Sequence, residues 1–456
     1  MERVDVAVVG GGPGGSSAAW EAARHGADTL LVEKGVPRAD RDEPGPDSTD
    51  AAGMLDYWVD IMGLDPSEFP DDVVLRRIED AEFHGPNESV TLDGTGIDAS
   101  YSSMGYTFHR ARMDDHMRDR AESAGARYRV GDGVRSLEAD ADEAHVLELA
   151  DGETVAADRL VLADGPQRTV TGDVLDQFLP GDVGDRLSAK RANHIAYQEY
   201  RRFPPELFDE DTLKFWWGYM PGETAYPWVF PNDGRVARVG LTMPIDLDLD
   251  AVEDRGAYAL LDGDDDDRVP RGGEYVRRLI EREYGPQGYS VDDFPVVEDR
   301  GKAGGTETYP ISSTRPIESP VGADVAVVGG AMGATSAFHE GGYHVAVRTG
   351  REAGRLAAQG RLARYNDAWR AAVGTELLRN VAFADIVEDY GPPDWDRAFR
   401  TASAMTNASP DENGLLSLSP SAGVAGLEYY LRYKAHRFRN RDGRYVQLRE
   451  SEYRYT

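Results

Sequence analysis

The stretch DVAVVGGGPGGSSAA, residues 5–19, decides the fold. A valine-rich run, typical of a buried parallel strand, leads into the spacing Gly10-x-Gly12-x-x-Gly15. Alanine-rich sequence typical of a helix follows, and a second apolar run, ADTLLVEKG, ends in Glu33. A strand, a glycine-rich turn, a helix and a second strand ending in an acid about twenty residues later form the fingerprint of a dinucleotide-binding βαβ unit.

Each residue of this fingerprint has a physical task. Gly10 allows a tight turn, Gly12 lets the backbone approach a pyrophosphate at the helix N-terminus, and Gly15 lets helix and strand pack closely. Glu33 can accept hydrogen bonds from a ribose 2′-OH, which favours FAD or NAD over NADP. The alternative is a glycine-rich turn without a ligand. We expect the cofactor contacts of this unit to be Gly10, Gly12, Gly14, Gly15 and Glu33.

A second stretch, DVAVVGGAMGATSAF at residues 324–338, repeats the first almost letter for letter. Its glycines do not keep the G-x-G-x-x-G spacing, and no second strand ending in an acid follows at the required offset. A second nucleotide-binding unit is therefore not expected. We predict instead that this strand joins the same sheet, that a long helix starts near Gly341, and that both loops hold one ligand.

The composition excludes several classes of protein. The 456 residues include no cysteine, so disulfides, thiolate-held iron–sulfur clusters and a cysteine nucleophile are excluded. The net charge of −32 makes nucleic acid an unlikely partner and is typical of proteins from a salt-loaded, halophilic cytoplasm. With no signal peptide and no apolar run of membrane-spanning length, a cytoplasmic protein is expected. We predict no metal site.

The late glycines resemble the flavin-proximal motif of FAD-dependent enzymes related to the para-hydroxybenzoate hydroxylases. That motif reads Gly-Asp-Ala, then a glycine pair and a helix, and here the sequence has Gly329-Gly330-Ala331 and the pair at 341–342. The resemblance implies FAD, with the isoalloxazine ring near Gly330, Gly333, Gly341 and Gly342. Gly330 replaces the family's aspartate, which would hold the ribityl chain.

Two further segments match the same family. GYTFHRARMDDHM, residues 105–117, has an arginine between a strand and a helix, and LADGPQR, residues 162–168, has the Asp-Gly pair at a strand end. The resemblance implies that Arg110, Asp164 and Gly165 bind FAD. Each segment alone would be an ordinary surface arginine or turn, but together and in order they favour FAD.

The middle of the chain contains YPWVFP, residues 226–231, which resembles the Tyr-x-Trp-x-Phe-Pro core of the geranylgeranyl reductase family. The resemblance implies FAD-dependent reduction of isoprenoid double bonds. On a strand, Tyr226, Trp228 and Phe230 would share one face, and with Trp216 or Trp217 they would form an aromatic wall for a prenyl chain. Plain core packing is the alternative for each of these residues.

The expected fold class is α/β, with a Rossmann-like FAD-binding domain, an inserted antiparallel-sheet substrate domain and a C-terminal helical segment. The FAD-binding domain is predicted to comprise residues 1–170 plus 301–360, the substrate domain residues 171–300, and the helical region residues 361–456. Turn signals between short β-rich runs indicate the antiparallel sheet.

The expected reaction is hydride transfer from reduced flavin to a prenyl lipid, with His339 and Tyr226 as candidate proton donors. An external reductant is needed, either NAD(P)H or a small electron carrier, which could be a protein. Two alternatives stay open: an FAD-dependent monooxygenase acting on an apolar or aromatic substrate, and a flavin-binding protein without turnover, suggested by Gly330.

The C-terminal segment LEYYLRYKAHRFRNRDGRYVQLR, residues 427–449, is basic and aromatic within an acidic chain. Peripheral contact with anionic lipid headgroups would explain this composition. The alternative, which the sequence favours, is a C-terminal helix packed on the protein's own acidic surface.

Overall fold

The two similar stretches lie in one parallel sheet. The computed structural model describes residues 1–42, 53–181, 192–252, 254–262, 265, 268–406 and 420–455. Its first seven-stranded sheet consists of β8 (Arg127–Val130), β2 (Thr29–Glu33), β1 (Glu2–Val9), β11 (Thr154–Leu162), β10 (His145–Leu149) and β9 (Val134–Glu138), with β17 (Val325–Val327) also pairing with β11.

Strand β11 lies between the two repeats, because β1 and β17 both pair with it in parallel. Val9 and Val327 both face Leu162 in the register, so the two glycine loops leave the sheet at the same edge. The expectation that the second stretch returns to the first sheet is confirmed. The side chains of Val6–Val9 and of β17 are all buried, as the valine-rich runs predicted.

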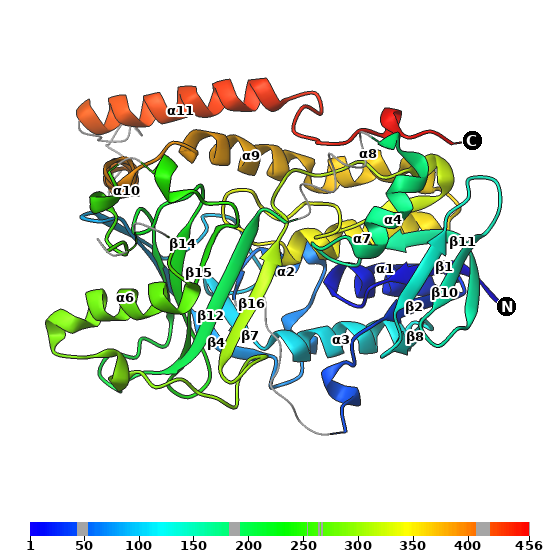
Figure 1. The fold of residues 1–456 in the computed structure, drawn as a ribbon, viewed down its shortest axis with the longest axis horizontal. Helices are drawn as coiled ribbons and strands as arrows, with labels where there is room; N and C mark the ends of the chain where they lie inside the picture. The colour runs from blue at the N-terminus through cyan, green and yellow to red at the C-terminus, as the bar shows by residue number, and fades with distance from the viewer. Residues whose placement is uncertain are drawn as a thin grey trace.

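Helices α1 (Pro13–Arg24) and α7 (Tyr343–Ala358) follow the two loops and pack against each other beside this sheet (Figure 1). Helix α3 (Arg110–Ser123) also packs on α1, and α4 (Thr169–Phe178) follows β11. The α1–α7 crossing is so close that a Cβ at Gly350 would come within 2.0 Å of the Gly14 carbonyl oxygen. Glycine is therefore required at this point of the crossing.

The second seven-stranded sheet is mostly antiparallel and lies on the other side of the molecule (Figure 1). Its order is β16 (Thr306–Ile311), β12 (His194–Arg202), β15 (Val236–Pro244), β14 (Tyr226–Pro231), β13 (Thr212–Trp216), β5 (Asp80–His84) and β6 (Ser89–Leu92). Strands β5, β6 and β16 fall within the ranges assigned from the sequence to the FAD-binding domain. The predicted boundaries differ here because β5 and β16 reach this sheet by long-range pairing with β13 and β12.

The remaining elements cover these two sheets. A small sheet of β3 (Gly53–Leu55), β7 (Gly105–Phe108) and β4 (Val74–Ile78) lies with α2 (Trp58–Met62), and α6 (Gly272–Tyr284) packs on β12 and β15. The chain ends in α8 (Tyr365–Trp369), α9 (Thr375–Val387), α10 (Pro392–Thr406) and α11 (Pro420–Asn440). Within the described residues, no helix combines the length and the apolar character that crossing a bilayer requires.

Candidate active site

Two cavities meet at the glycine loop after β1. The larger, of about 590 Å³, lies between the glycine loops of the first sheet and the aromatic face of the second. The smaller, of about 250 Å³, lies beside Glu33 and the start of α3. Gly12 and Arg110 line both cavities. An elongated ligand can therefore pass from one cavity to the other along the N-terminus of α1.

The three fingerprint glycines have the geometry that a dinucleotide requires. Gly10 has a φ of +102°, and a Cβ there would lie 2.4 Å from the Ala163 carbonyl oxygen. A Cβ at Gly15 would lie 1.8 Å from the Gly10 carbonyl oxygen, so Gly10 and Gly15 serve close packing and do not line either cavity. A Cβ at Gly12 would meet nothing within 4 Å, which leaves the space that a pyrophosphate needs at the helix N-terminus.

Glu33 lies at the end of β2 and lines the smaller cavity. Its two carboxylate oxygens accept hydrogen bonds from the Gly11 and Gly35 amides, each at 2.6 Å. These bonds hold the carboxylate at the cavity wall while leaving further lone pairs for ribose hydroxyls. The site fits the adenosine half of FAD.

Arg110 begins α3 between the two cavities. Its Nε donates to both carboxylate oxygens of Asp114 at 2.8 Å, and its guanidinium lies over the Tyr343 ring at 5.1 Å. Burial raises the pKa of Asp114, and the adjacent Arg110 opposes that effect. A fixed cation next to a helix N-terminus suits a pyrophosphate.

The second group of glycines forms the other wall of the larger cavity. Gly165, Gly330, Gly341 and Gly342 all line it, and α7 begins directly after Gly342. A Cβ at Gly330 would lie 3.2 Å from Pro166, which gives a physical reason for glycine where the related family has aspartate. The larger cavity therefore has backbone on one side, as a planar ring system requires.

Besides Gly10 and Gly15, two more residues assigned to the cofactor from the sequence do not line either cavity. Asp164 points to the start of α4, where its carboxylate accepts from the Val170 amide at 2.7 Å and from the Thr171 hydroxyl at 2.5 Å. Gly333 has a φ of +74°, and a Cβ there would lie 2.3 Å from the buried Arg168 guanidinium. Both residues shape the loops, and the sequence motif does not separate that task from ligand contact.

The opposite wall of the larger cavity is aromatic. Trp217, Tyr226, Trp228 and Phe230 line it as expected, with Trp217 stacked on Tyr226 at 4.3 Å between ring centroids. Trp216 is a correction, because it points to the other face of the sheet and stacks on His84 at 5.4 Å. The alternation of side chains along a strand forces neighbouring residues to opposite faces.

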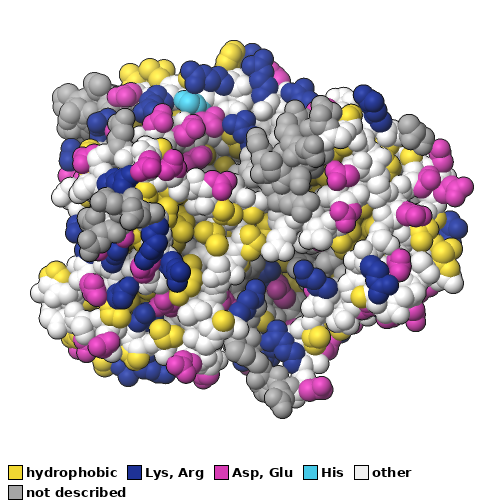
Figure 2. All heavy atoms as spheres, viewed as in Figure 1, with side chains coloured by type: hydrophobic (Ala, Val, Ile, Leu, Met, Phe, Trp, Pro, Cys, Tyr) yellow, Lys and Arg dark blue, Asp and Glu magenta, His cyan; other side chains and the backbone are white. Residues whose placement is uncertain are grey.

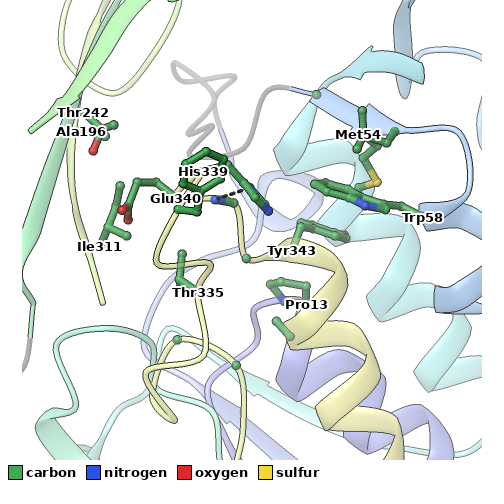
Figure 3. A pocket seen from close by; sticks show the side chains of 18 of the residues that line it. Pro13, Met54, Trp58, Ala196, Thr242, Ile311, Thr335, His339, Glu340 and Tyr343 are labelled. Carbon is green, nitrogen blue, oxygen red and sulfur yellow. Dashed lines mark hydrogen bonds between the residues drawn. The ribbon is translucent and has the colours of Figure 1, made fainter. Parts of the chain in front are cut away.

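The two predicted proton donors both lie at this cavity. Figure 3 shows His339 directed towards Trp58, and their ring centroids are 6.2 Å apart. Burial lowers the pKa of His339 to about 4, with His344 and Arg379 adding to the effect, so this imidazole is neutral at pH 7. The Tyr226 hydroxyl donates to the His339 carbonyl oxygen at 2.7 Å.

Several residues of the larger cavity were not found from the sequence. Trp58, Phe338 and Tyr343 all line it, and Trp58 stacks on His344 with 4.0 Å between ring centroids. Trp58 lies far from the glycine motifs in the chain, and no local pattern marks it. Glu340, which the sequence places with His339 beside the glycine pair, also lines this cavity.

Comparisons with known proteins agree with this geometry. The FAD binding domain family matches residues 3–181. The digeranylgeranylglycerophospholipid reductase of Methanocaldococcus jannaschii is 27% identical over 403 residues, covering 86% of this chain and 88% of the relative. Digeranylgeranylglycerophospholipid reductase 2 of Methanothermobacter thermautotrophicus is 26% identical over 431 residues, covering 91% and 96%.

Solved structures share the fold. A geranylgeranyl bacteriochlorophyll reductase-like protein from Thermoplasma acidophilum superposes with a TM-score of 0.66 at 20% identity, covering 97% of this chain and 99% of that one. A myxobacterial FAD-dependent halogenase superposes with a TM-score of 0.54 at 18% identity, covering 98% and 93%. The cavities agree with the FAD binding domain match, and the chain as a whole is similar to the curated digeranylgeranylglycerophospholipid reductases.

Proposed function

We propose that this protein reduces isolated carbon–carbon double bonds in the geranylgeranyl chains of lipids. The observation that carries the proposal is the aromatic wall of Trp217, Tyr226, Trp228 and Phe230 opposite the flavin-side glycines in one cavity. A long apolar chain would bury its surface against these rings, which is favourable at roughly 25 cal/mol per Å². The names of the curated relatives support this substrate class.

The protein's residues would bind, orient and keep out water. Gly12, Glu33 and Arg110 would hold the adenosine and pyrophosphate of FAD, and the loop at Gly341 would face its ring. When bound and reduced, FAD supplies the hydride. The aromatic wall would hold the double bond over the ring, so that orientation and exclusion of water lower the barrier. The flavin would be reduced by NAD(P)H or by a small electron carrier.

The test is a single turnover without oxygen. The purified protein is loaded with FAD, reduced with dithionite and mixed with a geranylgeranyl lipid, and mass spectrometry should show gains of two hydrogens per reduced double bond. A fully saturated lipid of the same headgroup is the control and should gain nothing. A hydroxylated product formed only with oxygen and NAD(P)H would instead support the monooxygenase. Protein that never binds FAD would reject both enzyme functions.

We also propose that α11 brings the protein to a membrane surface. The inner face of this helix packs on α9, where Tyr433 stacks on Phe383 at 5.0 Å and Asn440 donates to Asp385 at 2.7 Å. The outer face, which forms the upper edge in Figure 1, carries four exposed apolar side chains at helical spacing. These are Leu427, Tyr430, Leu431 and Phe438, each 54–57% exposed.

Basic residues accompany these apolar side chains. Lys434 lies over the Tyr430 ring at 5.2 Å and Arg441 over the Phe438 ring at 3.7 Å, and Figure 2 shows hydrophobic and basic side chains together along this edge. The rest of the chain is strongly acidic, with a total net charge of −32. An apolar stripe with basic neighbours suits the interface of an anionic bilayer.

A series of stacked rings connects this helix with the cavity. Tyr433 stacks on Phe383, Phe383 contacts Phe338 at 5.4 Å, and Phe338 stacks on Trp217 at 5.6 Å. Phe338 and Trp217 both line the cavity. Packed aromatic rings thus link the helix to the wall of the cavity.

Replacing Leu427 and Leu431 by aspartate should reduce binding to phosphatidylglycerol vesicles at least about tenfold, because two apolar anchors are lost and two negative charges added. Co-sedimentation measures the bound fraction. The matched control replaces Ile97 and Ile245, 49% and 47% exposed elsewhere, by aspartate and should bind like the unaltered protein. Equal binding by the Leu427 and Leu431 variant would contradict the role of α11.

A further inference from the structure

Glu340 has an unusual backbone at the edge of the cavity. It precedes the pair Gly341–Gly342, lines the cavity and has a φ of +53°, a conformation that side-chain-bearing residues rarely adopt. Its partner Thr224 has a φ of +50°. Such strain costs on the order of 1 kcal/mol or more at each position and clusters at functional sites. Two strained residues that contact each other at a cavity point to a task for their side chains.

The Glu340 carboxyl lies in a small polar cluster built from three separate segments. The Thr224 hydroxyl is hydrogen-bonded to Glu340 Oε1 at 3.0 Å, and His194 Nδ1 lies 3.9 Å from the same oxygen. The Glu340 and His194 side chains are only 3% and 4% exposed. Among the described residues, Glu340 Oε2 has no hydrogen-bond partner. The Thr224 hydroxyl thus holds Oε1 in place, whereas no hydrogen bond within the described residues holds Oε2.

The surroundings of Glu340 favour its protonated form. Burial raises the pKa of the carboxyl, while His194 and the hydroxyls of Ser313 and Thr224 oppose that effect. The other acid that faces this cluster is Glu223, which precedes Thr224 and also faces Asp385 on α9 and Glu388 directly after that helix. None of these carboxyl groups stabilises an ionised Glu340. A buried glutamic acid with a raised pKa is a suitable general acid.

The other two candidates are less suited to donate a proton. His339 has a pKa of about 4, so it carries no imidazolium proton at pH 7. Burial raises the pKa of Tyr226 far above its usual range, and its hydroxyl already donates to the His339 carbonyl oxygen. Figure 3 shows that His339 extends towards Trp58, whereas Glu340 extends towards the strand that carries Ile311, on the side of the substrate sheet.

We propose that Glu340 is the acid that protonates the substrate double bond. The inference rests on the proposed function. The reduced flavin's hydride adds to one alkene carbon, the π bond breaks, and the Glu340 proton adds to the other carbon. The product has a single bond there, the flavin is oxidised, and Glu340 is left as a carboxylate. The balance requires one hydride and one proton, and the external reductant restores the flavin.

His194 is itself held in this cluster by a backbone contact. Glu223 is exposed to solvent, and its carbonyl oxygen accepts from His194 Nε2 at 2.9 Å. A carbonyl oxygen only accepts, so Nε2 donates in this contact, and Nδ1 lies on the side of Glu340. His194 therefore lies between the solvent-exposed Glu223 and the buried Glu340. It acts as a positioning residue for the acid.

The test compares Glu340→Gln with the unaltered protein in separate half-reactions. The variant should bind FAD and be reduced by dithionite at the normal rate, because neither step uses this proton. Its flavin reoxidation by a geranylgeranyl lipid without oxygen should slow by about 100-fold at pH 7, the typical contribution of a general acid. Glu340→Asp should recover part of the rate, since it keeps the acid group.

Infrared spectroscopy supplies a readout that does not depend on turnover. At pH 7 the unaltered protein should show a protonated-carboxyl C=O band that Glu340→Gln lacks. Glu376→Gln is the matched control and should keep the band. Burial raises the pKa of Glu376, but the hydrogen bond from His344 and the charge of Arg348 outweigh burial and hold that pKa at about 2.

The outcomes separate this inference from the proposed function. An unaltered protein that reduces no prenyl lipid rejects the function. An active protein whose Glu340→Gln variant reoxidises equally fast rejects the role of Glu340. Absence of the infrared band in the unaltered protein rejects a protonated Glu340, whatever the substrate proves to be.

Discussion

Replacing Gly12 by valine should give a stably folded protein that no longer binds FAD. Gly12 has φ −70° and ψ −175°, which valine readily adopts, and a Cβ there would meet nothing within 4 Å. The added isopropyl group would occupy the space at the N-terminus of α1 through which the pyrophosphate must pass. We expect the affinity for FAD to fall by at least about 100-fold, equivalent to about 3 kcal/mol.

The measurement is a fluorescence titration of the flavin-free protein with FAD, together with a thermal unfolding curve. Gly94→Val is the control, because that glycine is also surrounded by open space but lies outside both cavities. A Gly12→Val protein that purifies yellow with the normal ratio of FAD to protein would contradict the location of the pyrophosphate.

Replacing Gly350 by leucine should have the opposite effect, because it should lower the stability of the fold itself. A Cβ at Gly350 would lie 2.0 Å from the Gly14 carbonyl oxygen, and one at Gly354 would lie 2.1 Å from that of Ala18. Helices α1 and α7 would have to separate, and the α1 N-terminus would move with them. Overpacking of this kind typically costs about 1–3 kcal/mol, and we expect the upper end because backbone atoms are opposed.

Chemical denaturation of the flavin-free protein measures this loss directly. Gly256→Leu is the matched control, since that glycine is exposed, lies in the short 3₁₀ helix Arg255–Ala257 and has open space around its Cβ position. A normal midpoint for Gly350→Leu would show that the α1–α7 crossing is looser than the structure describes.

The sequence was sufficient where function depends on residues close together in the chain. The spacing of Gly10, Gly12 and Gly15 from Glu33 predicted a strand, a helix and a second strand. This succeeded because the three segments follow one another in the chain and the hydrophobic period of each depends only on neighbouring residues. The same holds for Tyr226, Trp228 and Phe230, whose alternation predicted one shared face. These local patterns identified FAD and the aromatic wall.

The sequence failed where a residue's task depends on a distant partner. Asp164 has the right motif but caps α4, and Trp216 was separated from Trp217 only by the pairing of β13 within its sheet. The pairing of β5 with β13 brings a segment from the first hundred residues into the substrate sheet. No pattern within those segments records such long-range pairings.

The two valine–glycine repeats show most clearly which features the sequence determines and which the tertiary structure decides. By itself the sequence determined that the first binds a dinucleotide and that the second lacks the offset acid to do so. Only the tertiary structure decided that β11 lies between them and aligns both loops at one edge. It also brought His194, Thr224 and Glu340 together from three segments. Local spacing fixes local geometry, whereas contacts between distant residues follow from how sheets and helices bury their apolar faces together.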